Sequence, residues 1–387
     1  MQQDYLMPSY QRQPVSFVRG QGMQLWDQQG NVYLDAIAGV AVTNLGHAHP
    51  EIAEVISQQA RCLLHTSNLF GIQWQQQLAE KLCQLAQMDG AFFANSGAEA
   101  NEAALKIARL HGKQLGISAS KVVVMENSFH GRTFATLAAT GNPAIKQDFT
   151  PLPDDFIRVP YNDIDAVKVL TTRTDIAAVL LEPVQGEGGV NPVEATYLQQ
   201  LRTVCDQQQW LLMLDEVQTG LGRTGQWFAY QHSDIVPDVM TLAKALGNGL
   251  PIGACLAKGA AAQLLQAGTH ASTFGGNPLV CRTACQVLDI IQRDQLVINA
   301  QQRGQQLLQR LQEQLAGHPN VISIRGVGLM LAIELNQDAS HLVSQALQQQ
   351  QLLISVTRQK NIRLLPALIC GAEQIEEIVQ RLVALLN

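Results

Sequence analysis

The sequence predicts an α/β protein with a mainly parallel sheet covered by helices on both faces. Two observations carry this prediction. Five short apolar runs, each closed by polar or turn residues, have the continuous hydrophobicity of strands that are buried on both sides; they span residues 91–95, 121–125, 176–183, 210–216 and 238–243. Helical patterns at 99–112 and 195–209 lie between them. Ligands of such sheets bind beyond the carboxyl ends of the strands, so the residues that follow each strand are the candidates for function.

The length of 387 residues favours two domains over one. After about residue 278 the pattern changes to a long helical stretch from Leu279 to about Ala316, strand-like segments and a last helix, which indicate a smaller α/β domain. Residues 17–36 read as a hairpin. We therefore expect residues 1–45 to join the small domain at 279–387, with 46–278 forming the large domain.

Composition excludes several classes of protein. The formal net charge of −6 provides no basic surface for nucleic acid. No secretory pattern opens the chain, and no apolar run approaches the roughly 20 residues that span a membrane. Seven cysteines without a C-x-x-C pair predict reduced thiols in the cytoplasm. His47 and His49 share a loop but lack a third ligand, so we expect no metal site.

An anion-binding helix start follows the first strand. Ser96 and Glu99 have the spacing of a capping box. Gly97 and Ala98 would expose backbone N–H groups where the helix dipole favours a phosphate. Because capping boxes are common, an ordinary capped helix is the alternative interpretation.

Two charged residues follow strongly apolar strands. Asp215 ends the run WLLML, where a carboxylate stays ionised only if something positive faces it. That partner is either a structural cation or the cationic ring nitrogen of a ligand. Lys244 lies in MTLAKALGNGLPIGA, and either its stem lies along a helix surface with the amine in water, or its amine does chemistry.

Further polar and aromatic side chains converge on the same sheet edge. The third strand ends near Glu182 and Glu187, and the second leads to Phe129, His130 and Arg132. Together with the α-helix start, Asp215 and Lys244, these residues could bind a phosphate, a ring face, a cationic ring nitrogen and an aldehyde. Pyridoxal 5′-phosphate (PLP) has these four features. Residues 220–225, GLGRTG, formally match a dinucleotide motif, but they neither follow a strand directly nor open an apolar helix.

Several long motifs resemble those of the class III PLP-dependent aminotransferases. They are NSGAEANEAALKIAR, FHGRT, EPVQGEGG, LDEVQTGLGRTG, LAKALGNGLPIGA and STFGGNP, in this order, and the similarity covers nearly the whole chain. The resemblance implies a fold-type-I PLP enzyme with a seven-stranded, mainly parallel sheet, a small domain built from both termini, and a homodimer with shared active sites.

The resemblance also implies roles for individual residues. Lys244 would hold PLP covalently and carry the proton between substrate and cofactor, and Asp215 would keep the ring nitrogen protonated. The other cofactor contacts would come from Phe129 and Val217 on the two ring faces, Gln218 on the ring hydroxyl, and Gly97, Ala98 and the partner subunit's Thr273 on the phosphate. Arg132, with Ser272 nearby, would bind the substrate carboxylate. Arg363 would bind the α-carboxylate of glutamate, and Glu187 would pair with Arg363 when that carboxylate is absent. Tyr10 also matches an active-site position.

Within the class, the chain is most similar to the acetylornithine aminotransferases. These enzymes move the terminal amino group of N2-acetyl-L-ornithine to 2-oxoglutarate in a ping-pong reaction through pyridoxamine phosphate. Ornithine, succinylornithine and 4-aminobutyrate aminotransferases stay open as alternatives. Where the ornithine enzymes carry a tyrosine, this chain has Gly71. Two alternatives come from other classes of enzyme: a PLP racemase or mutase of the same fold, and a dehydrogenase that binds its dinucleotide through GLGRTG.

Overall fold

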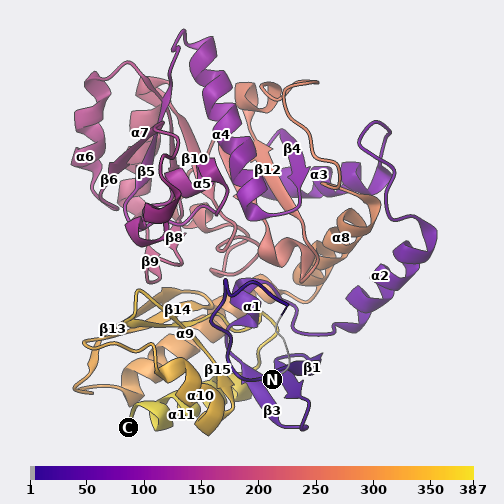
Figure 1. Ribbon diagram of the computed structural model, residues 1–387, viewed down its shortest axis with the longest axis vertical. Coiled ribbons are helices and arrows are strands. Elements are labelled where there is room, and N and C mark those ends of the chain that lie inside the picture. Colours follow the sequence, from indigo (N-terminus) through magenta and orange to yellow (C-terminus); the bar gives the residue numbers. More distant parts are fainter. Residues whose placement is uncertain (1–4) are drawn as a thin grey trace.

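The computed structural model describes residues 5–387 and shows two layers of structure, a large sheet with its helices and a smaller unit beneath it (Figure 1). Within these residues the large sheet has seven strands in the order β4-β12-β11-β10-β7-β5-β6. β12 runs antiparallel to both neighbours, and the other pairings are parallel. The strands are β4 (Gly90–Ala94), β5 (Lys121–Met125), β6 (Phe156–Val159), β7 (Ile176–Leu181), β10 (Leu211–Asp215), β11 (Val239–Leu242) and β12 (Gly253–Ala257). The predicted fold class is confirmed.

Two of these strands were not predicted from apolar runs. β6 is an edge strand with the polar Arg158 and an only partly buried pattern, so it lacks a continuous hydrophobic run. β12 begins directly after the segment that follows Lys244. That segment is rich in turn residues, a pattern that indicates a loop rather than the start of a strand. The five strands predicted from sequence lie within one to two residues of their observed bounds.

Helices cover both faces of the large sheet. α4 (Gly97–Gln114) packs on one face, against β7, β10, β11 and β12. The other face buries α3 (Gln73–Ala86) and α7 (Ala195–Gln208). The remaining helices before the small unit are α1 (Ala38–Ala41), α2 (Pro50–Cys62), α5 (Phe134–Ala139) and α6 (Ile164–Lys168).

The stretch from Leu279 to about Ala316 is helical over nearly its whole length, as predicted, but it is divided into two helices. It forms α8 (Pro278–Arg293) and α9 (Leu296–Gln314), because Gln295 between them adopts a left-handed φ of 52° that ends the first helix. α8 packs against α2 and α3, whereas α9 packs against the small unit (Figure 1). The division of the chain at residue 278 stays a prediction.

The smaller unit combines the two ends of the described chain. A four-stranded sheet, β13-β14-β17-β16, carries α9 and is followed by α11 (Ala372–Leu386). Its strands are β13 (Val321–Val327), β14 (Met330–Leu335), β16 (Ser355–Thr357) and β17 (Asn361–Leu364), and α10 (Leu342–Gln350) follows β14. The hairpin predicted at 17–36 is a three-stranded meander, β1 (Phe17–Gln21), β2 (Gln24–Asp27) and β3 (Val32–Asp35), and β3 pairs in parallel with β15 (Leu352–Leu353).

Arg223 joins the two layers. It is fully buried, and its guanidinium donates to the carbonyl oxygens of Leu329 (2.9 Å) and Pro366 (2.5 Å) and to Oδ1 of Asn44. Burial lowers the pKa of Arg223 to about 10, so the group stays charged at neutral pH. Arg223 lies in GLGRTG, which forms turns rather than the strand-to-helix junction of a dinucleotide site. The motif serves the packing of the two layers.

Replacing this arginine should destabilise the fold. We expect Arg223→Met to cost about 2–4 kcal/mol, because two buried carbonyls and an amide oxygen lose their donors. Differential scanning calorimetry would show this as a thermal midpoint several degrees lower. Arg381→Met is the control, since Arg381 also donates to two carbonyl oxygens but is partly exposed. Equal midpoints for the two variants would contradict the role of Arg223.

Candidate active site

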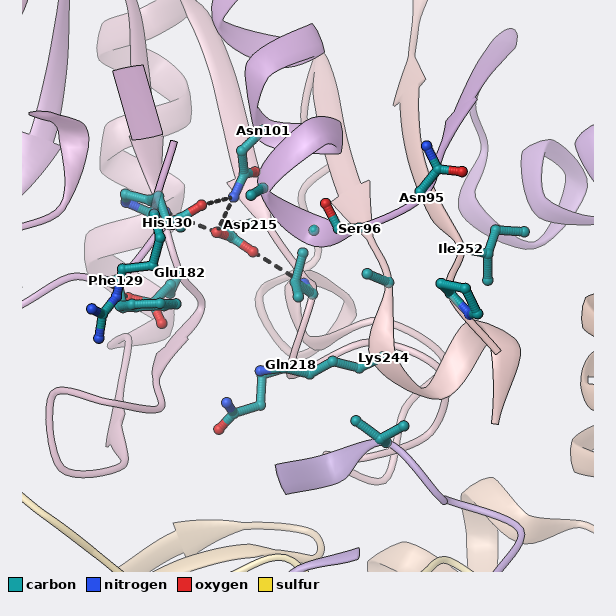
Figure 2. A pocket seen from close by; sticks show the side chains of 18 of the residues that line it. Asn95, Ser96, Asn101, Phe129, His130, Glu182, Asp215, Gln218, Lys244 and Ile252 are labelled. Atoms are coloured by element: carbon teal, nitrogen blue, oxygen red, sulfur yellow. Dashed lines mark hydrogen bonds and ion pairs between the residues drawn. The ribbon is translucent and has the colours of Figure 1, made fainter. Parts of the chain in front are cut away.

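A cavity of about 450 Å³ opens at the carboxyl ends of the parallel strands. Residues that follow β4, β5, β7, β10 and β11 contribute to its lining, as expected for this class of sheet. Nine of the predicted site residues border it: Gly97, Ala98, Phe129, Arg132, Glu187, Asp215, Val217, Gln218 and Lys244. Figure 2 shows several of these side chains turned toward one another. The sheet therefore gathers residues that are up to 147 positions apart (97 to 244) into one site.

The start of α4 forms one wall of the cavity. The Ser96 hydroxyl caps the helix by accepting from the N–H of Glu99 at 3.2 Å. The Glu99 carboxylate accepts from the N–H of Asn95 at 2.5 Å rather than from that of Ser96. A Cβ on Gly97 would lie 2.8 Å from Val217 Cγ1, so only glycine fits. The free N–H groups and the dipole of this first turn make it suitable for an anion.

Asp215 is buried and held from several sides. Its Oδ2 accepts from Asn101 Nδ2 and lies next to His130 Nδ1, both at 2.8 Å, and its Oδ1 accepts from the N–H of Val217 at 3.1 Å (Figure 2). No Lys or Arg ion pair with Asp215 is found within residues 5–387. The carboxylate is thus fixed by neutral donors and one imidazole, with room on the cavity side for a cationic group.

Asn101 and Thr241 were missed from the sequence. The Asn101 amide also donates to the carbonyl oxygen of His130 at 2.8 Å and accepts from Thr241 Oγ1 at 2.7 Å. Its position on the first turns of α4, one helical turn after Gly97, is a signal that could have found it. Thr241 of β11 is the register partner of Asp215 of β10.

Lys244 projects from a strained backbone. Its φ is +44°, a region that non-glycine residues rarely adopt. The side chain is half-buried because it borders the cavity, and its amine has no hydrogen-bond partner within residues 5–387. Burial lowers the pKa of Lys244 to about 8 against the opposing charge of Glu187. An uncommitted amine with a lowered pKa is suited to act as a nucleophile.

An ion pair closes the cavity from the small unit. Arg363 of β17 is buried, and its Nη1 lies 2.5 Å from Glu187 Oε1. Burial alone would raise the pKa of Glu187, but the charge and hydrogen bond of Arg363 hold it below its ordinary value. Gln218 lies beside this pair, with its Oε1 3.5 Å from Arg363 Nη1. A Cβ on Gly186 would clash with the Gln218 amide at 2.2 Å, which explains the glycine there.

Phe129 and Arg132 line the opposite side. The Phe129 N–H donates to Glu182 Oε2 at 2.9 Å. Arg132 lies over the Phe129 ring, with its Cζ 5.7 Å from the ring centre. The Arg132 guanidinium is exposed and has no ion-pair partner within the described chain. Burial, and next the charge of Asp215, raise the pKa of Glu182 well above its ordinary value. The cavity thus offers a free arginine and an aromatic face.

Four predicted site residues are not part of this lining: Arg363, described above, and Ser272, Thr273 and Tyr10. Ser272 and Thr273 border a separate surface pocket with Asn68, although Ser272 Oγ accepts from Asn95 Nδ2 at 3.2 Å. Tyr10 is exposed and stacks with Arg12. His47 pairs with Asp35 at 2.7 Å, which gives it a structural partner. None of the helices within residues 5–387 is long and apolar enough to cross a membrane.

Comparison with known families decides the class of enzyme. The family model described as "Aminotransferase class-III" matches residues 5–386. The chain belongs to the class III aminotransferases. Like other members of this class, this aminotransferase depends on PLP.

Individual relatives cover nearly the full length of this aminotransferase. It is 52% identical to the acetylornithine aminotransferase of Nitrosomonas europaea, over 99% of this chain and 98% of that protein. Its structure is similar to that of the acetylornithine aminotransferase of Elizabethkingia anophelis (TM-score 0.88, 34% identity, 99% and 96% of the two chains). It is also similar to the ornithine aminotransferase of Toxoplasma gondii (TM-score 0.95, 32% identity, 99% and 92%).

Removing the Lys244 amine should stabilise the cofactor-free aminotransferase. A lysine whose pKa falls from 10.5 to about 8 on folding destabilises the fold while it is charged. This penalty is complete below pH 8, decreases between pH 8 and 10.5, and is absent above that range. Lys244→Met should therefore raise the thermal midpoint at pH 7, and the gain should shrink at pH 9.5.

The matched control for this prediction is Lys168→Met, because Lys168 is exposed. That variant should leave the midpoint nearly unchanged at both pH values. A Lys244→Met protein that is less stable than the wild type at pH 7 would contradict the argument.

Proposed function

We propose that this enzyme moves the terminal amino group of N2-acetyl-L-ornithine to 2-oxoglutarate, giving N-acetyl-L-glutamate 5-semialdehyde and L-glutamate. The observation that carries the proposal is the unpartnered Lys244 amine in a cavity that also contains Asp215 and the anion-binding turn of α4. The 52% identity to an acetylornithine aminotransferase supports the choice of donor. Seven free cysteines, five of them buried, suit a reducing compartment, so we place the reaction in the cytoplasm.

The residues present fit PLP. The close approach of Gly97 to Val217 leaves the N–H groups of the α4 start accessible to a phosphate, which Gly97 and Ala98 would bind. Phe129 and Val217 border the cavity where two ring faces need apolar contact, and Gln218 would donate to the ring hydroxyl. The Asp215 carboxylate is held so that it can stabilise a protonated ring nitrogen. Bound there, PLP supplies an electron sink for breaking a C–H bond.

Lys244 would work as the base. Its amine would hold the cofactor when no substrate is bound. When the amine is not engaged in this way, it would take up the proton from the substrate carbon. The lowered pKa of Lys244 helps, because a larger fraction of the amine is neutral near pH 8 than for an ordinary lysine.

Two arginines would position the substrates. Arg132 would bind the carboxylate of acetylornithine and so set how far the terminal amine reaches, with Ser272 nearby. Arg363 would take the α-carboxylate of 2-oxoglutarate once Glu187 leaves it. With a donor that lacks this second carboxylate, Glu187 would stay on Arg363 and keep its buried charge paired. Tyr10 would reach the substrate only in an arrangement other than the exposed one described here.

We also propose a homodimer with shared active sites. Apolar side chains are exposed around Ser272 and Thr273: Leu69 is 87% exposed, Phe70 68% and Phe274 62%. Such a patch is typical of a protein interface. Thr273 lies outside the cavity of its own chain, and in a dimer it would reach the partner's phosphate. Light scattering at assay concentration tests this assembly, since an active monomer would exclude it.

Ornithine is the second candidate donor, because the ornithine aminotransferase of T. gondii has the higher TM-score, 0.95. Gly71 argues against it. A side chain at this position would have space, because no atom would lie within 4 Å of its Cβ. Gly71 follows the segment whose Ser67, Asn68 and Leu69 line the same surface pocket as Thr273. In the dimer this open position would leave room for an acyl group.

Chemical trapping tests the assignment of the base. Borohydride reduction of the holoenzyme should fix the cofactor on Lys244, as read by peptide mass spectrometry. Lys244→Ala should lose nearly all transamination, because nucleophile and base are removed together, while still binding PLP through the remaining contacts. Cofactor found on another lysine would overturn the assignment.

Donor preference tests the substrate. We expect kcat/KM for N2-acetylornithine to exceed that for ornithine by at least about tenfold, roughly 1.4 kcal/mol in transition-state binding. Gly71→Tyr should lower acetylornithine turnover more than ornithine turnover, since a bulky side chain would occupy the space for the acyl group. Equal or better use of free ornithine by the wild type would favour an ornithine aminotransferase instead.

A further inference from the structure

The segment that carries Glu187 is the tip of a short hairpin. β8 (Val184–Gln185) and β9 (Asn191–Pro192) pair antiparallel, and the hairpin tip is residues 186–190. The tip extends from the large layer toward the sheet of the small unit, and β9 packs against β13 (Figure 1). Backbone groups of this tip, as well as the Glu187 side chain, are held by arginines of the small unit.

Arg325 of β13 holds the tip two residues beyond Glu187. Its Nη2 donates to the carbonyl oxygen of Gly189 at 2.7 Å, and its Nε donates to that of Val190 at 3.2 Å. The other donors bind Ser323 Oγ (2.7 Å), Glu334 Oε2 (2.6 Å) and Asn361 Oδ1 (2.7 Å). All five N–H donors of a guanidinium are thus used, so Arg325 is committed to this structure and is not free to bind a ligand.

The sheet register places Arg325 and Arg363 on one face. Arg325 is the cross-strand partner of Ala332, and Ala332 is the partner of Arg363. Direct cross-strand partners share a face, and the small side chain of Ala332 separates the two arginines. In the next row, Glu334 pairs with Asn361, and both bind Arg325. One sheet face therefore holds the hairpin tip at two points, by the Glu187 side chain and by the backbone after it.

The two points differ in what substrate binding demands of them. The proposed reaction requires Glu187 to leave Arg363 when 2-oxoglutarate binds and to return for the donor. The two bonds of Arg325 to the tip run to backbone carbonyls and do not depend on the Glu187 side chain. Gly189 fits this close contact, since its φ is +114° and a Cβ would lie 3.2 Å from Arg325 Nη2. The tip can thus stay docked while one side chain moves.

We propose that Arg325 is a positioning residue that keeps the hairpin tip docked, so that Glu187 re-forms its pair with Arg363 at little entropic cost. This inference rests on the proposed function, in which Arg363 receives the acceptor's α-carboxylate. Without Arg325, the tip has to be ordered each time the pair forms. Arg363 then stays unpaired more often, which is costly for a buried cation when the bound donor provides no carboxylate. The donor half-reaction depends on Arg325, and the acceptor half-reaction does not.

Single-turnover kinetics of the two half-reactions test this. In the holoenzyme, Arg325→Gln should lower kcat/KM for acetylornithine relative to that for 2-oxoglutarate by at least about fivefold, as expected for the loss of charged hydrogen bonds. Glu187→Gln should shift the same ratio in the same direction. Arg325→Lys should fall between Arg325→Gln and the wild type. Hydrogen exchange of the amides at 186–191 should be faster in Arg325→Gln.

Arg310→Gln is the matched control. Like Arg325, Arg310 is partly buried and forms ion pairs, here with Glu313 and Glu376, but it lies on α9 away from the hairpin tip. It should leave the ratio unchanged. If Glu187→Gln shifts the ratio while Arg325→Gln and Arg325→Lys match the wild type, the role of Arg325 is excluded and the proposed function stands. If Arg325→Gln lowers both half-reactions equally, Arg325 is merely structural. If Glu187→Gln leaves the ratio unchanged, the premise and this inference both fail.

Discussion

The constraint on which this site depends is a carboxylate at the end of a buried strand. Asp215 lies between β10 and the cavity with little exposure, so each of its oxygen atoms needs a donor. Asn101 and His130 supply them from α4 and from the segment after β5, and the N–H of Val217 supplies another. These donors fix where the carboxylate points. In the proposed function, the same arrangement would determine where the cationic ring nitrogen lies and would orient the cofactor.

A second carboxylate, Glu182, ends the neighbouring strand, and the two environments separate their behaviour. Burial and the charge of Asp215 raise the pKa of Glu182 well above its ordinary value. Its acceptor atoms are used by the N–H groups of Phe129 (2.9 Å) and Gly186 (3.3 Å). Glu182 therefore supports the loops that carry Phe129 and the hairpin tip, and Asp215 faces the cavity. Two acidic residues at one sheet edge have different tasks because their hydrogen-bond partners differ.

Local strain is concentrated where the chemistry is. Lys244 has a left-handed backbone conformation, and Gly97 and Gly186 allow contacts that a Cβ would prevent. Each feature costs stability and persists because the surrounding sheet over-determines it. The two layers contribute unequally: the large layer supplies Asp215, Lys244 and the α4 start to the cavity, and the small sheet supplies Arg363, the partner of Glu187.

The class of fold, the order of the central strands along the chain and the nature of the main chemical groups can be predicted from the amino-acid sequence. Apolar runs and the residues directly after them are local signals, so Asp215, Lys244 and the α4 start are recognisable from the chain alone. Resemblance then assigned Glu187 to Arg363, although these residues are 176 positions apart. The edge strand β6, the antiparallel β12 and the break at Gln295 were not predicted, because pairing and packing decide them rather than periodicity. Only the tertiary structure brought Asn101 to Asp215 and Arg325 to the hairpin tip, since hydrogen bonds between distant segments leave no pattern along a single chain.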